Sequence, residues 1–87
     1  MPEEKDEVGR ELEVDELREN TIVFTNPSHM PKVFASVWVE KITADMIFFY
    51  AGELKLTLCV FRQPDGTLKD GFDHQIHVFE YLGEYPT

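Results

Sequence analysis

Short runs of β-branched and aromatic residues, each ended by residues that favour turns, constrain this fold more than any other feature. The runs cover residues 21–25, 33–42, 46–51, 54–61 and 72–82, and Gly, Pro, Asn or Asp stands between them. Runs of this composition are typical of strands. We therefore expect an all-β fold, a small antiparallel meander of five to six short strands. It forms a curled sheet or closes into a barrel of the SH3-like kind.

The run at 54–61 alternates most regularly. Leu54, Leu56, Leu58 and Val60 face one way, and Lys55, Thr57, Cys59 and Phe61 face the other. This alternation is typical of a strand with one buried face, so it predicts that the leucines belong to the core. The sequence Pro64-Asp65-Gly66 follows, and it predicts a tight turn because Pro presets φ and Gly accepts a positive φ. A hairpin partner is expected from Thr67, with a bulge or second turn at Asp70-Gly71.

The other runs also divide into two faces. In residues 33–42, the aliphatic face consists of Val33, Ala35, Val37 and Val39. Asn26 and Pro27 are expected to end the run at 21–25 in a turn. The final run is expected to be one long strand over residues 72–82.

The acidic residues are concentrated at the start of the chain. Residues 1–19 hold nine acids and three basic residues, which gives −6 of the net charge of −9. We expect residues 1–9 to be a disordered acidic tail and residues 10–87 to be a single β domain. Alternation from Glu11 predicts a short strand over residues 11–15, in which Leu12 and Val14 share a face.

Composition excludes several classes of function. No apolar stretch approaches the ~20 residues that span a bilayer, so no membrane association is predicted. After residue 19 the basic residues are scattered singly, which argues against nucleic-acid binding. The single cysteine, Cys59, cannot form an intramolecular disulfide, which fits a cytoplasmic location. We interpret Cys59 as a small apolar filler.

No motif for a cofactor or a metal is present. The sequence lacks the glycine-rich phosphate loops, the GxSxG motif, the HExxH motif and the CxxC motif. His74 and His77 are three residues apart, and on a strand this spacing sends the two rings to opposite faces. His29 is distant in the sequence. We therefore predict neither a cofactor nor a bound metal.

A second apolar face is the feature that favours a function. Phe34, Trp38, Phe61, Phe79 and Tyr81 lie opposite rows that already supply a core. They form either a second layer of core or an exposed patch, and such a patch marks a protein interface or an apolar ligand groove. We interpret the chain as a binding or assembly module, for which a homodimer is the simplest arrangement. The predicted binding residues are Phe34, Trp38, Tyr50, Phe61, His77, Phe79 and Tyr81.

The alternative is a small enzyme or a domain that binds an apolar or aromatic ligand. Its pocket would be lined by Phe34, Trp38, Tyr50, His77 and Phe79. Asp73 shares a face with His77 but stands about 13 Å from it along a strand, too far for a hydrogen bond. A general-base role for His77 therefore requires an acid from a neighbouring strand.

Overall fold

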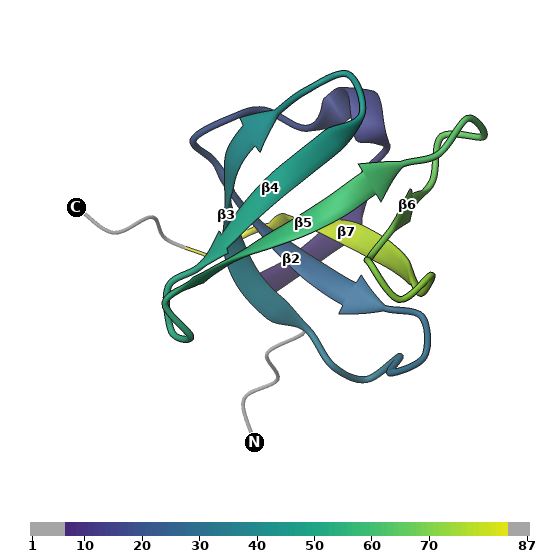
Figure 1. Ribbon diagram of the computed structural model, residues 1–87. Coiled ribbons are helices and arrows are strands. Elements are labelled where there is room, and N and C mark those ends of the chain that lie inside the picture. Colours follow the sequence, from purple (N-terminus) through teal and green to yellow (C-terminus); the bar gives the residue numbers. More distant parts are fainter. Residues whose placement is uncertain (1–6, 84–87) are drawn as a thin grey trace.

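Seven strands form one antiparallel sheet in the computed structural model, which describes residues 7–83 (Figure 1). The sheet order is β1-β7-β2-β3-β4-β5-β6, and β6 also pairs with β7. This last pairing closes six strands into a barrel, with β1 added outside it on β7. The predicted all-β antiparallel fold is confirmed, and an SH3-like barrel is consistent with it. The strands are β1 (Val8–Glu11), β2 (Ile22–Pro27), β3 (Ala35–Ile42), β4 (Met46–Ala51), β5 (Leu56–Arg62), β6 (Leu68–Lys69) and β7 (Gln75–Tyr81).

The turn between β5 and β6 forms where the sequence predicts it. Gly66 has a φ of 88°, which a residue with a Cβ rarely adopts. The Gln63 N–H donates to the Thr67 carbonyl at 2.9 Å, and the Asp65 carboxylate accepts from the Thr67 N–H at 3.0 Å. These bonds hold the hairpin and direct β6 back along β5.

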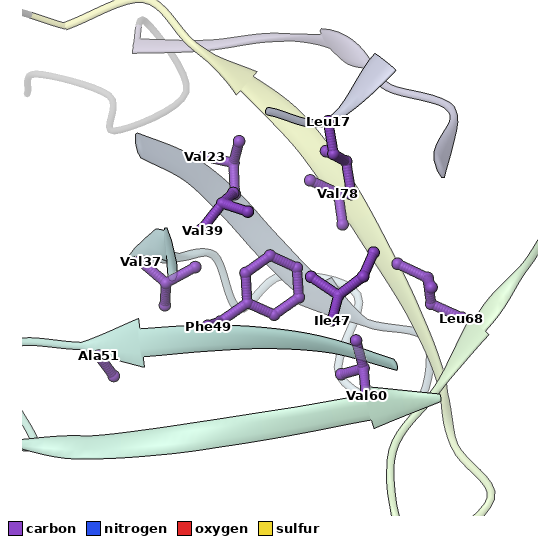
Figure 2. Packing of buried hydrophobic residues seen from close by; sticks show 10 residues of the cluster. All are labelled: Leu17, Val23, Val37, Val39, Ile47, Phe49, Ala51, Val60, Leu68 and Val78. Carbon is purple, nitrogen blue, oxygen red and sulfur yellow. The ribbon is translucent and has the colours of Figure 1, made fainter. Parts of the chain in front are cut away.

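The core fills the barrel from the middle strands (Figure 2). Val37 and Val39 from β3 and Ile47 and Phe49 from β4 are the largest fully buried side chains. Figure 2 shows them in one cluster with residues from β2, β5, β6 and β7. The inward rows predicted for β3 at Val37 and Val39 are therefore confirmed.

The N-terminal segment corrects two predictions. Val8 and Gly9 belong to β1, and the expected strand over 11–15 is replaced by a 3-10 helix, η2 (Val14–Glu16). Gly9 lets β1 approach β7 closely, because a Cβ there would lie 2.8 Å from the Cβ of Glu80. The buried Leu17 then joins the core. Residues 1–6 of the predicted tail lie outside the described residues.

The prediction for β5 that Leu54, Leu56 and Leu58 belong to the core is wrong. Leu54 lies before the strand and is 68% exposed, because Lys55 adopts a φ of 55° and belongs to the turn. Leu56 and Leu58 are 41% and 38% exposed, whereas Val60 is buried. The reason is that β6 contains two residues and pairs with β5 only at Phe61 and Arg62, so it does not extend along the first half of β5.

Three other boundaries differ from the prediction. Asn26 and Pro27 continue β2 instead of turning, and Val33 lies before β3 and is 45% exposed. Phe72 precedes β7 and is 83% exposed, because the Asp70 carboxylate caps a turn that continues to His74. No helix within residues 7–83 is long and apolar enough to cross a membrane.

Candidate functional site

A row of predicted aromatic residues crosses the outside of the barrel. Trp38 of β3 lies directly opposite Tyr50 of β4, and Tyr50 lies opposite Thr57 of β5. Their chain neighbours Val37, Val39 and Phe49 face the core, so Trp38 and Tyr50 face outward. We call Trp38, Tyr50 and Thr57 the outer row. Its last member, Thr57, lies in the first half of β5, which pairs with β4 on one side and with no described strand on the other.

A second group of aromatic rings lies on the outside of β2 and β7. Phe34 packs edge-on against Phe79 with ring centroids 5.4 Å apart, and Phe24 packs against Tyr81 at the same distance. Phe24 is buried by these contacts, while the other three rings are half-buried. This group therefore forms a packed outer layer, and its role as a partner surface remains a prediction.

Phe61 is separate from both groups. It lies on β5 between Met46 of β4 and Lys69 of β6, and it is 42% exposed. Cys59 also points outward from β5 and is exposed, so its interpretation as an apolar filler is wrong. Tyr81 lines one groove with Trp38 and an adjoining groove with Phe34, so these predicted residues border a common outer surface, while Phe61 lies apart from them on β5.

His77 lies between an acidic side chain and a hydroxyl group from neighbouring segments. Its Nδ1 lies 2.7 Å from the Glu11 Oε2, and its Nε2 lies 2.8 Å from the Ser28 Oγ. Glu11 comes from β1, which pairs with β7, and Ser28 follows β2, which pairs with β7 on the other side. The sequence could not reveal this arrangement because the three residues are 17 or more positions apart.

The residues predicted for the pocket of the alternative hypothesis do not line a single cavity. Trp38 and Phe34 line two adjoining grooves on the outer surface, which share Ser36, Glu53 and Tyr81. His77 borders a different cavity of about 340 Å³, whose polar members include the carboxylates of Glu11, Glu13 and Asp65. Hydrogen bonds from Thr67 to Asp65 hold the pKa of that carboxyl below its usual range.

The other two histidines, His29 and His74, contact each other between two loops, the one after β2 and the one before β7. The rings of His29 and His74 stack with centroids 3.8 Å apart. The His74 Nδ1 lies 3.4 Å from the Asp70 Oδ2. Burial would raise the pKa of Asp70, but the N–H groups of His74 and Phe72 donate to its carboxylate, and the pKa is lowered. Within residues 7–83, no group of three or more His, Cys, Asp or Glu side chains could hold a metal ion.

The open edge of β5 is the site that the sequence analysis missed. The Arg62 N–H donates to the Asp45 carbonyl at 2.8 Å, and these two residues continue by one position the register in which Met46 lies opposite Phe61. Hydrogen-bonded pairs alternate along an antiparallel ladder, so the main-chain groups of Leu58 and Val60 point toward β4 and those of Thr57 and Cys59 point away. In the part of the chain that the structure describes, no strand pairs with Thr57 or Cys59 on that side.

An apolar groove lies beside this edge. It has a volume of about 240 Å³, and its lining includes Phe49, Leu58, Val60, Phe72 and Ile76. Phe72 projects from the turn between β6 and β7 with 83% of its surface exposed. The signal that could have revealed the edge is the spacing of Gly66 and Gly71, which leaves room for only a very short β6.

Comparison with protein-family models, with curated proteins and with solved structures finds no match.

Proposed function

We propose that this domain is an assembly module that pairs with a second copy of itself along the open edge of β5. The observation that carries the proposal is the coincidence of unpaired main-chain groups at Thr57 and Cys59 with the exposed side chains of Leu56 and Leu58. An edge strand with exposed apolar residues is a template for another strand. A second strand would satisfy the main chain and cover the leucines together.

The composition of the edge favours a second copy as the occupant. Residues 56–61 carry no charged side chain in a protein whose net charge is −9. Natural edge strands are usually protected by a Lys, a Pro or a bulge, and this segment has none of them. Two such edges meet without repulsion between like charges across the ladder. A two-fold axis then buries the same residues twice.

The pairing has one register that uses both open positions. If the axis passes beside Leu58, Thr57 lies opposite the Cys59 of the second copy, and Cys59 lies opposite its Thr57. Each of these pairs exchanges both N–H···O bonds, because both residues direct their main-chain groups outward. Leu58 then faces its own counterpart at a position without ladder hydrogen bonds, where side chains are closest.

The outer row connects the predicted aromatic surface to the proposed interface, because it ends on β5. Thr57 ends the row that begins at Trp38, and Cys59 lies opposite Phe48 on β4. In the proposed register, the row of one copy continues into Cys59 and Phe48 of the other. The outer aromatic surface would become continuous across the two barrels.

Sedimentation of matched variants tests the proposal. We expect wild-type protein to be a weak dimer with a Kd roughly in the micromolar range, because one strand pair buries less than the ~800 Å² per partner of a standard interface. Leu58→Asp should give a folded monomer. Leu54→Asp is the control, since Leu54 is the more exposed leucine and lies outside the paired segment. A wild-type monomer, or equal loss of dimer in both variants, would contradict the proposal.

Disulfide cross-linking tests the register. Leu58→Cys in a Cys59→Ser background should cross-link under oxidation, since the Cα atoms of the facing pair would be about 4.5 Å apart. The native Cys59 should not cross-link. In this register the two copies of Cys59 are two residues apart along the strand direction, so their Cα atoms would be farther apart than the ~7 Å limit for a disulfide. Cross-linking through Cys59 alone would refute this register.

Trp38→Ala distinguishes the open edge of β5 from the outer row. If Trp38→Ala abolishes the dimer and Leu58→Asp does not, assembly uses the outer row and not the open edge.

A further inference from the structure

Ser28, His77 and Glu11 form a continuous hydrogen-bonded chain on three neighbouring segments. The Ser28 Oγ lies 2.8 Å from the His77 Nε2, and the His77 Nδ1 lies 2.7 Å from the Glu11 Oε2. A carboxylate only accepts, so the Nδ1–H donates to Glu11. In the neutral ring the Nε2 then carries the lone pair and accepts from the Ser28 hydroxyl. This is the order of groups in which a histidine can remove a proton from a serine.

We infer that Ser28 is a nucleophile that accepts the acyl group of a small carboxylic ester, with His77 as its general base and Glu11 as the positioning residue. The proposal is independent of assembly through β5, since none of these residues lies on that strand. It rests on three residue types in their functional order, with both distances in the range of strong hydrogen bonds.

The turn that carries Ser28 is held from several directions. The Ser28 N–H donates to the Gln75 carbonyl at 2.8 Å, and the Met30 N–H donates to the Pro27 carbonyl at 2.9 Å. The buried Asn26 side chain donates to the carbonyls of Met30, Pro31 and Val33. A nucleophile on a fixed turn loses less freedom in reaching its reactive position.

A donor for the developing oxyanion is present beside the nucleophile. The residue after Ser28 is His29, and no described acceptor takes a hydrogen bond from its main-chain N–H. The N–H that follows a nucleophile is a common oxyanion donor. Stacking of the His29 ring on His74 restrains this part of the turn.

The reaction balances with an ester and water as the two reactants. The Ser28 Oγ bonds to the acyl carbon while its proton passes to the His77 Nε2, and the bond to the leaving oxygen breaks as that oxygen takes the proton. Water then attacks the acyl-serine with the same base, releasing the carboxylic acid and restoring Ser28. Glu11, Glu13 and Asp65 line the cavity on the far side of His77 from Ser28, and their negative charge favours neutral or cationic esters over anionic ones near this site.

A fluorophosphonate probe tests the nucleophile directly, and the chain supplies its own control. Ser28 and Ser36 are the two serines, and both are exposed. We expect mass spectrometry of the labelled protein to place the adduct on Ser28 and not on Ser36. Labelling should slow by about 10²-fold or more in His77→Gln, because Gln can keep a hydrogen bond but cannot act as the base. Glu11→Gln should slow it as well, and Glu11→Asp should restore part of the rate.

Hydrolysis of p-nitrophenyl acetate gives a second readout. Wild-type protein should show a burst of nitrophenol and an acetyl group on Ser28, and Ser28→Ala should lose both. Ser36→Ala and Leu54→Asp should retain both, since neither residue belongs to the Ser28 site or to the paired segment of β5. Equal labelling of the two serines, or an unchanged labelling rate in folded His77→Gln, would overturn the inference.

Discussion

Phe49 of β4 and Leu58 of β5 lie directly opposite each other, yet they differ completely in burial. Both face the inside of the barrel, but Phe49 is 0% exposed and Leu58 is 38% exposed. β4 is paired along its length on both sides, whereas β5 has a full neighbour only in β4. The comparison shows that the position of a residue along a strand determines which face its side chain points to, and that the neighbouring strands determine whether that side chain is buried.

Substitution of Phe49 is expected to have the largest effect. Phe49→Ala removes a fully buried ring from the middle of the core and leaves a cavity, at a cost of about 3 to 5 kcal/mol. Such a loss is a large part of the stability of a small domain. Urea unfolding should show a strong fall in the midpoint. A cost below ~1.5 kcal/mol would mean that the two sides of the barrel do not differ as described.

Two amide side chains extend the comparison to polar contacts. Asn26, on β2, is 6% exposed and donates to three carbonyls, so Asn26→Ala should cost about 1 to 3 kcal/mol by leaving buried acceptors unsatisfied. Gln63, after β5, donates to the Phe61 carbonyl at 3.2 Å on the surface. Gln63→Ala should change the free energy of unfolding by less than ~0.5 kcal/mol. Equal costs in thermal unfolding would argue against this distinction.

Leu58 provides the counterpart to Phe49. At protein concentrations too low for association, Leu58→Ala should cost about 1 kcal/mol, because much of the side chain is already in water. At high concentration, the wild-type protein should gain stability over this variant, since binding a second copy stabilises only the folded state. Unfolding at two concentrations measures the difference. A cost near that of Phe49→Ala at low concentration would show that Leu58 is core.

The smallest expected effect concerns the segment that carries Leu17 into the core. Arg10 donates to the Glu16 carboxylate at 2.7 Å, and with the Glu13 N–H it lowers the pKa of Glu16 from 4.5 to about 2. The stabilisation is therefore fully present above pH 4.5 and is lost as the pH falls toward 2. Glu16→Gln should reduce this pH dependence of the thermal midpoint. An identical slope in both proteins would show that the pair does not contribute, as holds for many exposed ion pairs.

The sequence predicted the features that depend only on neighbouring residues. The turn at Gly66, the inward row of Val37 and Val39, and the limits of β4 all follow from residue type and period. The open edge of β5 does not, because the exposure of Leu58 depends on how short β6 is. The site at His77 depends on pairing between strands that are distant in the sequence. The sequence predicts that a general-base role for His77 requires an acid from another strand, but it does not identify Glu11 as that acid or Ser28 as the second partner.

Amide hydrogen exchange of wild-type protein at two concentrations tests the central claim that the open edge of β5 pairs with a second copy. In dilute monomer, the N–H groups of Thr57 and Cys59 should exchange rapidly, while those of Leu58 and Val60, which point toward β4, should be protected. At concentrations where sedimentation shows a dimer, Thr57 and Cys59 should become protected as well. Rapid exchange of Thr57 and Cys59 in the dimer, or protection of both in the monomer, would contradict the account.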